Sequence, residues 1–171
     1  MQSLRIKVYG KRIFRDKEAL DLIRRAATAT WEDAGIDLPA QLEVTLTDDA
    51  GIREINRDTR EIDAPTDVLS FPMQDFYHGE CELMEYNLDP ESGRLPLGDM
   101  VLSVERARAQ GEEFGHGFRR ECAYLTVHSC LHLLGYDHLD EGPEKKLMRE
   151  KEEVIMDRLG LRRDMTLEES K

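Results

Sequence analysis

Three of the five histidines in the chain, His128, His132 and His138, fall within eleven residues. His128 and His132 are four positions apart, so on a helix they would lie about 40° apart around the axis and about 6 Å apart along it. Gly135 can adopt the left-handed conformation that ends a helix, which would let the chain bring His138 back to the same face. Three converging imidazoles that leave a fourth position to water are the ligand set of a catalytic zinc site. The sequence therefore predicts one Zn²⁺ ion bound by His128, His132 and His138 at the end of a helix.

The helix that carries these histidines is predicted to be buried, because apolar residues surround it from Phe118 to Leu134 instead of forming one stripe. Four other segments have the alternating or compact apolar pattern of strands: residues 4–8, 42–46, 68–71 and 100–104. Helical spacing and capping residues predict four further helices: residues 16–35, 48–55, 104–113 and 143–160. Residues 76–96 are acidic and show no period, which indicates a surface loop.

Length and composition favour one domain, and the order strand, helix, strand, helix along its first half suits the α/β (α+β) class. With 171 residues and 40% hydrophobic content, the chain has room for one core and one active site. We expect the domain to cover residues 1–160, with a flexible tail over residues 161–171.

Several features favour a cytoplasmic protein with no membrane partner. The first residues are charged where a signal peptide would be apolar, and the longest uncharged stretch is too short to span a bilayer. The three cysteines have no CxxC spacing, which suits reduced thiols, and Cys122 and Cys130 are expected to be buried. The net charge of −12 disfavours generic binding of nucleic acid, because that affinity comes from Lys and Arg displacing counterions. RNA would have to be bound through a local basic patch, the metal, or an assembly that delivers it.

The histidine spacing also occurs in the metzincin proteases, where a glutamate directly after the first histidine is the general base. Here that position is Ser129, whose hydroxyl cannot take a proton from zinc-bound water near neutral pH. A peptidase would need another carboxylate, such as Glu121 or Asp137. The simpler interpretations are that Glu121 hydrogen-bonds a metal-binding histidine or is a surface charge. Asp137 would then simply belong to the turn. A phosphodiester depends more on charge neutralisation than on a protein base, and it calls for a nearby arginine.

Four segments carry a specific pattern in a fixed order: Ile55-Asn-x-x-x-Arg60, Pro65-Thr-Asp-Val-Leu-Ser-Phe-Pro72, Leu97-Gly-Asp99 and His128-x3-His132-Leu-Leu-Gly-Tyr-Asp-His138. Together with Leu147-Met-x4-Glu153, they resemble the YbeY family of bacterial metal-dependent endoribonucleases. The resemblance covers nearly the whole chain from Leu4 to Gly160. It implies a zincin-like single domain in which a buried central helix packs on a small mixed four-stranded sheet.

The resemblance also implies the chemistry. His128, His132 and His138 match the family's zinc ligands, and Arg60 matches its functional arginine. The catalytic groups would then be Arg60 and a zinc-bound water held by the three histidines. The substrate would be single-stranded RNA, specifically ribosomal RNA in 16S rRNA 3′-end maturation and ribosome quality control, and no action on DNA is expected. Small-subunit ribosomal proteins or assembly factors would be its partners.

Two departures from the family pattern stand out: Ser129 replaces the usual glycine, and the acidic loop over residues 76–96 is longer than usual. His78 is expected at the surface, and His116 at the beginning of a helix. The sequence leaves open whether the metal is zinc, nickel or cobalt, and whether the attacking group is zinc-bound hydroxide or a ribose 2′-hydroxyl. Two other functions also stay open at this point. One is a peptidase or amidase on the same metal, and the other is a ribosome-assembly factor with a structural zinc.

Overall fold

Four strands form one mixed sheet in the order β1 (Leu4–Tyr9), β2 (Ala40–Thr47), β4 (Leu95–Ser103) and β3 (Val68–Pro72). β1, β2 and β4 run parallel, and β3 pairs antiparallel with β4 at one edge. The structure is a computed structural model and describes residues 3–137 and 142–161. The α+β class, the mixed four-stranded sheet and the positions of the four strands are confirmed.

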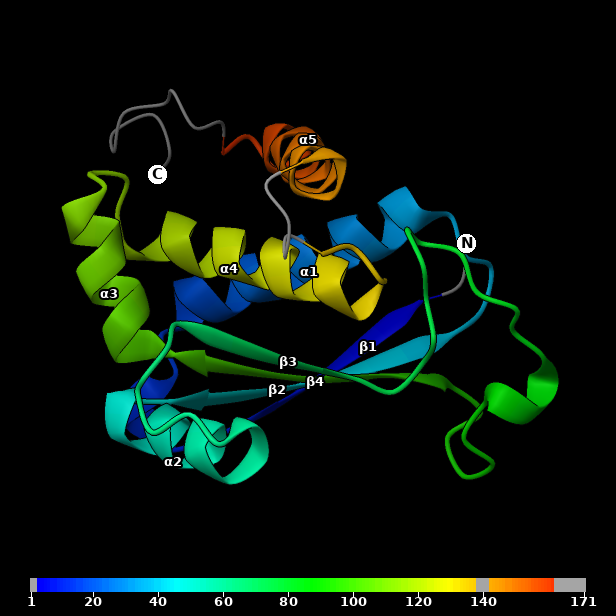
Figure 1. Cartoon of the computed structure of the whole chain (residues 1–171), viewed down its shortest axis with the longest axis horizontal. Helices are drawn as coiled ribbons and strands as arrows, with labels where there is room; N and C mark the ends of the chain where they lie inside the picture. The colour runs from blue at the N-terminus through cyan, green and yellow to red at the C-terminus, as the bar shows by residue number, and fades with distance from the viewer. Residues whose placement is uncertain (1–2, 138–141, 162–171) are drawn as a thin grey trace.

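The helices lie in layers around this sheet (Figure 1). α1 (Lys17–Ala34) and α4 (Phe118–Leu133) cover one face, and α5 (Pro143–Arg158) packs on these two helices from outside. α2 (Asp49–Arg60) lies on the other face, and α3 (Val104–Glu113) leads from the end of β4 to α4. Two short 3-10 turns, Arg12–Phe14 and Glu85–Asn87, lie in the connections.

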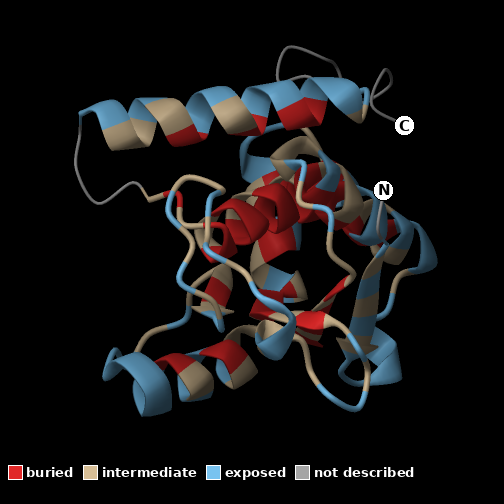
Figure 2. Cartoon of the chain, turned by 90° about the vertical axis from the view of Figure 1, so that its right-hand side faces the viewer, coloured by how far each residue is buried: buried red, intermediate tan, exposed pale blue. Residues whose placement is uncertain are grey.

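α4 is the central helix, as the sequence predicts. Leu125, Leu131 and Leu133 are each at most 2% exposed, and the helix contacts α1, α3, α5 and the sheet. Eleven of its 16 residues are buried, and Figure 2 shows the buried class concentrated in the middle of the molecule. Burying a large apolar side chain contributes about 1.5–3 kcal/mol, so packing on all sides fixes the position of this helix firmly.

Several predicted helix ends are also confirmed, but α2 continues to Arg60 instead of ending near residue 55. Asp16 and Asp48 each accept a hydrogen bond from a backbone N–H in the first turn of α1 and α2. Gly35 ends α1 in the left-handed conformation, and Pro143 opens α5 at its first turn. Cys122 and Cys130 are buried as expected, and burial raises the pKa of each thiol to about 12.

Two further boundaries differ from the prediction. β4 begins at Leu95 instead of Met100, so the predicted loop over residues 76–96 ends sooner. Gly98 interrupts the apolar pattern, yet the strand needs it: a Cβ there would lie 2.2 Å from the carbonyl oxygen of Phe71. Leu161 was placed in the flexible tail but is only 4% exposed and packs in the core, and residues 162–171 lie outside the described part. Within the described residues, no helix is both long and apolar enough to cross a membrane.

Candidate metal centre

His128 and His132 converge as their spacing predicts. Both lie on the last two turns of α4, and their Nε2 atoms are 3.2 Å apart. Their rings meet edge to face, with centroids 4.7 Å apart. Both side chains are half-buried, although the residues around them on α4 are buried. The two imidazoles therefore present nitrogens to one common point near the surface.

Glu152 on α5 holds the other side of His128. Its Oε1 lies 2.9 Å from Nδ1 of His128, and the residue is 7% exposed. Burial raises the pKa of the Glu152 carboxyl, but hydrogen bonds with His128 and Tyr124 outweigh this effect, and the pKa is lowered overall. An ionised carboxylate at Nδ1 keeps the ring proton there and leaves the lone pair of Nε2 free to bind a cation.

The sequence prediction did not include Glu152, although a signal for it was present. Met148, Glu152 and Ile155 share one face of α5 by helical spacing, and all three are buried. A carboxylate among core positions needs a partner, and the partner here is His128.

The geometry of this pair fits a metal ion of the predicted kind. Two imidazole nitrogens bound to a tetrahedral zinc ion at about 2.05 Å would lie about 3.3 Å apart. The observed separation of the Nε2 atoms, 3.2 Å, agrees with this value. A histidine ligand whose second nitrogen is bound to a carboxylate is the usual arrangement in metal sites.

The third predicted ligand, His138, lies outside the described residues. The turn toward it has the predicted form, since Gly135 follows α4 with φ +85°. Over residues 3–137 and 142–161, no group of three histidine, cysteine, aspartate or glutamate side chains could hold a metal ion. Asp137, the alternative base, is half-buried, and its role stays a prediction.

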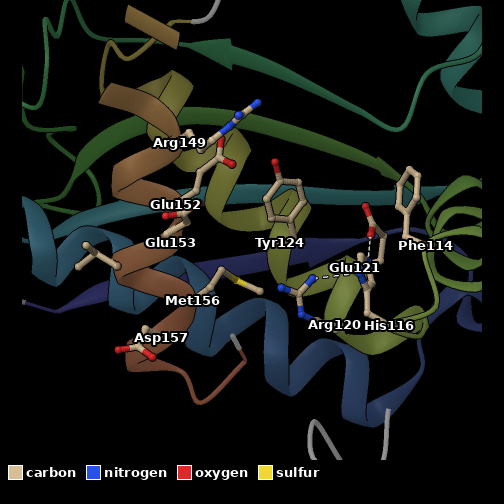
Figure 3. A pocket seen from close by; sticks show the side chains of 11 residues that line it. Phe114, His116, Arg120, Glu121, Tyr124, Arg149, Glu152, Glu153, Met156 and Asp157 are labelled. Carbon is tan, nitrogen blue, oxygen red and sulfur yellow. Dashed lines mark hydrogen bonds and ion pairs between the residues drawn. The ribbon is translucent and has the colours of Figure 1, made fainter. Parts of the chain in front are cut away.

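A cavity of about 910 Å³ lies between α4 and α5 (Figure 3). Among the described residues of the metal centre, Glu152 lines this cavity, whereas His128 and His132 do not. At its far end Glu121 is 1% exposed and pairs with His116 and Gln110. Glu121 is therefore no surface charge, and its contacts tie the first turn of α4 to α3 and to the residue that begins the helix.

Ser129 faces the sheet. Its side chain is fully buried, and its Oγ lies 2.7 Å from Oγ of Ser70 on β3. This hydrogen bond explains how serine is accommodated at this position, and it directs the hydroxyl away from the face that carries the histidines. Ser129 therefore cannot replace the glutamate of a metzincin protease.

Arg60 reaches the same part of β3 from the other side. It is the last residue of α2, and its guanidinium donates a 2.9 Å hydrogen bond to the carbonyl oxygen of Ser70. Its Cζ also lies 5.4 Å from the centre of the Phe71 ring. Ser70 thus contacts both Arg60 and Ser129, which connects the predicted arginine to the helix of the histidines. The arginine itself remains exposed to solvent.

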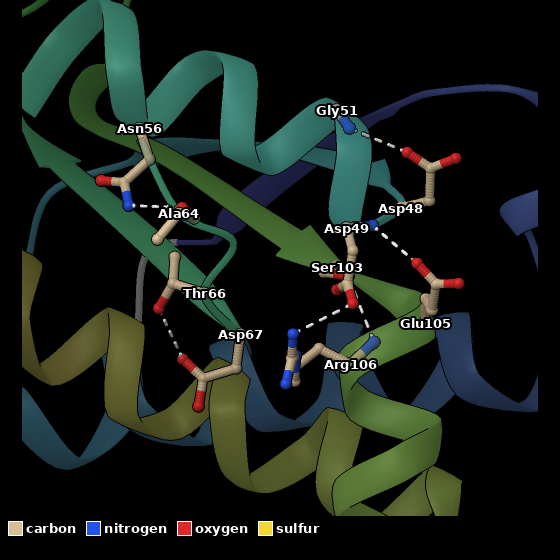
Figure 4. Close-up of polar contacts among 10 residues, drawn as sticks. All are labelled: Asp48, Asp49, Gly51, Asn56, Ala64, Thr66, Asp67, Ser103, Glu105 and Arg106. Carbon is tan, nitrogen blue, oxygen red and sulfur yellow. Dashed lines mark hydrogen bonds and ion pairs between the residues drawn. The ribbon is translucent and has the colours of Figure 1, made fainter. Parts of the chain in front are cut away.

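Other residues of the first two sequence patterns fix the connection that follows α2, and Figure 4 shows Asn56 and Asp67 among them. Asn56 is 4% exposed, and its Nδ2 donates a hydrogen bond to the carbonyl oxygen of Ala64. The side-chain carboxylate of Asp67 accepts a hydrogen bond from the backbone N–H of Val68. The backbone carbonyl oxygen of Asp67 accepts another from the backbone N–H of Ser103. These contacts fix the connection from α2 to β3, so their role is structural.

His78 is not a plain surface residue, contrary to the prediction. Its Nε2 lies 2.6 Å from a carboxylate oxygen of Glu144 on α5, and its side chain is 25% exposed. Its ring stacks between those of Tyr77 and Tyr136. The left-handed backbone of His78, with φ +49°, turns the chain so that these contacts form.

Comparisons with known proteins identify the family of this chain and support its fold. The family model described as endoribonuclease YbeY matches residues 6–160. A protein named endoribonuclease YbeY from Caldanaerobacter subterraneus subsp. tengcongensis is 52% identical over 142 residues, covering 83% of this chain and 88% of that protein. The protein of the same name from Acetivibrio thermocellus is 43% identical over 147 residues, covering 86% and 90%. The solution structure of TM1509 from Thermotoga maritima is 23% identical, with a TM-score of 0.55 and coverage of 90% and 91%, which supports the fold.

Proposed function

The chain belongs to the endoribonuclease YbeY family, and on this premise we propose that it cleaves single-stranded RNA at the centre formed by His128, His132 and His138, with Zn²⁺ as its cofactor. The observation that carries this proposal is the 3.2 Å approach of the two Nε2 atoms, with Glu152 on the far nitrogen of His128. His138 enters the proposal through its place in the sequence pattern.

Each side chain has a distinct task. When bound, a divalent ion supplies a Lewis acid that offsets negative charge on the phosphoryl oxygens. His128 and His132 would hold this ion, and Glu152 orients His128. Arg60 donates one hydrogen bond to the carbonyl oxygen of Ser70. Its exposed guanidinium has further N–H groups that can donate to a phosphate. These donors stabilise the charge that develops in the transition state.

The products of cleavage would identify the attacking group. Attack by the ribose 2′-hydroxyl next to the scissile phosphate gives a 2′,3′-cyclic phosphate, and it leaves DNA uncut. Attack by water gives no cyclic product. Ser129 is not the base for either route, because its hydroxyl is buried against Ser70.

The biological substrate is proposed to be ribosomal RNA in the cytoplasm, at the 3′ end of the 16S molecule, with ribosome quality control as a further role. The support is the family resemblance together with the charge of the chain. A net charge of −12 repels free RNA, so a substrate delivered by small-subunit ribosomal proteins or assembly factors suits this protein better than free RNA does.

The decisive experiment compares the cleavage of RNA and of a peptide by the parent, Arg60→Ala and His132→Ala. Arg60→Ala should lower the rate of RNA cleavage about 10²–10³-fold without changing the zinc content, because it removes charge stabilisation but none of the predicted metal ligands. His132→Ala should lower both. Arg57→Ala is the matched control, because Arg57 is an exposed arginine on the same helix that pairs with Asp58.

Two results would contradict this assignment. If Arg60→Ala cleaves RNA as fast as Arg57→Ala, then Arg60 has no role in the reaction. If the parent cleaves the peptide and not RNA, then the centre belongs to a peptidase.

A further inference from the structure

Three aromatic rings form a continuous stack at the C-terminal end of α4. The ring of Tyr77 lies parallel to that of His78, with centroids 4.0 Å apart and an interplanar angle of 19°. His78 in turn stacks on Tyr136, at 5.5 Å and 15°. Tyr136 is 8% exposed, His78 is half-buried, and Tyr77 is 67% exposed. The stack therefore begins in the core and ends in solvent.

The backbone beneath the stack is fixed. Gly79 donates a 2.8 Å hydrogen bond to the carbonyl oxygen of Leu134, and the hydroxyl of Tyr136 donates to the carbonyl oxygen of His78. A carboxylate oxygen of Glu144 is hydrogen-bonded to Nε2 at the edge of the His78 ring. A Cβ at Gly135 would lie 2.2 Å from the carbonyl oxygen of Phe76, so the segment lies directly on the turn that ends α4.

Core packing does not account for Tyr77. One face of its ring is covered by His78, and the high exposure of the residue leaves the other face open to water. An aromatic ring with one free face gains little from burial in this position. Tyr86, in the same long connection, is 82% exposed and has no stacking partner among the described rings. Of the two tyrosines, Tyr77 is therefore the one that stacks on another described ring.

We propose that the free face of Tyr77 stacks an unpaired base of the RNA substrate beside the metal centre. The stack lies against Leu134 and Gly135, which directly follow the turn of α4 that carries His132. A base on Tyr77 would therefore belong to the same RNA strand as the scissile phosphate. This inference rests on the proposed function and adds a residue that binds the substrate.

The charge of the chain strengthens the argument. Single-stranded nucleic acid is usually bound by basic grooves together with aromatic side chains. With a net charge of −12, the electrostatic share is small here, and stacking has to supply more of the affinity. Stacking on one aromatic ring contributes about 1–3 kcal/mol per base and tolerates any base. The site would accept different sequences, provided that the strand is unpaired.

The test uses the whole protein with zinc and a short single-stranded RNA that carries 2-aminopurine, whose fluorescence falls when it stacks on an aromatic ring. Phosphorothioate and 2′-O-methyl groups slow both routes of cleavage during the binding measurement. Tyr77→Ala should raise Kd about 5- to 150-fold and abolish the quenching. Tyr77→Phe should retain both Kd and quenching, because the phenyl ring still stacks.

Tyr86→Ala is the matched control and should bind and quench like the parent. With unmodified RNA, Tyr77→Ala should raise KM and leave kcat nearly unchanged, since stacking is equal in the ground and transition states. The dependence of Kd on salt should keep its slope, because no ionic contact is removed. If Tyr77→Ala matches Tyr86→Ala in Kd and in quenching, the inference is wrong. If the parent itself does not cleave RNA, the proposed function fails, which is a separate outcome.

Discussion

The carboxylate of Glu152 determines which nitrogen of His128 can face a cation. It comes from α5, so the position of that helix is part of the metal centre although none of the predicted ligands lies on it. A carboxylate at Nδ1 makes the opposite nitrogen a better ligand and stops the ring from rotating. The buried environment strengthens this contact, because few water molecules compete for it.

Glu152→Gln should therefore weaken zinc binding about 10- to 100-fold while the fold is retained. The amide keeps the size of the side chain and one acceptor oxygen, but it loses the charge that supports the ligand. Competition with a chromogenic chelator measures the change in Kd. Glu153→Gln removes the same charge from an exposed neighbour and serves as the control. Equal zinc affinity in the two variants would rule out this role for Glu152.

At the scale of elements, one hydrogen bond joins the central helix to the edge strand. Ser129 on α4 and Ser70 on β3 are both buried, and within residues 3–137 and 142–161 neither hydroxyl has another side-chain partner. Because Ser70 also accepts from Arg60 through its carbonyl oxygen, this bond links the histidine helix to the strand that positions the arginine.

Ser129→Ala should lower the free energy of unfolding by about 1–3 kcal/mol, because it leaves the Ser70 hydroxyl buried without its partner. Ser70→Ala together with Ser129→Ala should cost less than the sum of the two single changes, because neither hydroxyl is then left unpaired. Urea unfolding at a fixed zinc concentration measures all three variants. Strictly additive losses would show that the two hydroxyls do not interact.

The turn after α4 depends on glycine for two reasons at once. Gly135 has φ +85°, and a Cβ there would lie 2.2 Å from the carbonyl oxygen of Phe76. Gly35 ends α1 with φ +68° but has no atom within 4 Å of its Cβ position. At both positions a side chain would strain the left-handed backbone, but only at Gly135 would its Cβ also clash with another segment.

Gly35→Ala should therefore cost about 1–2 kcal/mol, which is the penalty for a left-handed residue with a Cβ. Gly135→Ala should cost more and should also lower zinc affinity, because the segment over residues 76–79 has to move away from the turn that leads to His138. Thermal unfolding and a zinc titration distinguish the two variants. A Gly135→Ala protein as stable as Gly35→Ala would show that the segment yields without cost.

For the molecule as a whole, local sequence patterns predicted the elements well, but they did not predict which distant residues contact each other. The strands, the buried helix, the caps of α1 and α2 and the approach of His128 to His132 all follow from spacings of a few residues. The contact of Glu152 with His128 joins positions 24 apart, and that of Ser70 with Ser129 joins positions 59 apart. Only the folded sheet and helix layers bring such residues together, so one sequence could suggest that these groups need partners but could not identify the partners.

Excess negative charge extends into the sheet itself. Asp99 on β4 lies directly beside Glu43 on β2. Burial, followed by the neighbouring Glu43 carboxylate, raises the pKa of the Asp99 carboxyl. A raised pKa means that the folded state binds this proton more tightly than the unfolded state does. The stability linked to that proton is therefore present at acid pH and is lost as the pH rises through the raised pKa of Asp99.

Asp99→Asn should consequently stabilise the protein at pH 7.5, by about 0.2–1 kcal/mol, because it removes one of two like charges on adjacent strands. The gain should shrink as the pH falls through the raised pKa of Asp99, since the parent then carries a neutral carboxyl at the same place. Urea unfolding of both proteins at a series of pH values measures the difference. A gain that stays constant down to acid pH would mean that packing, and not charge, distinguishes the two side chains.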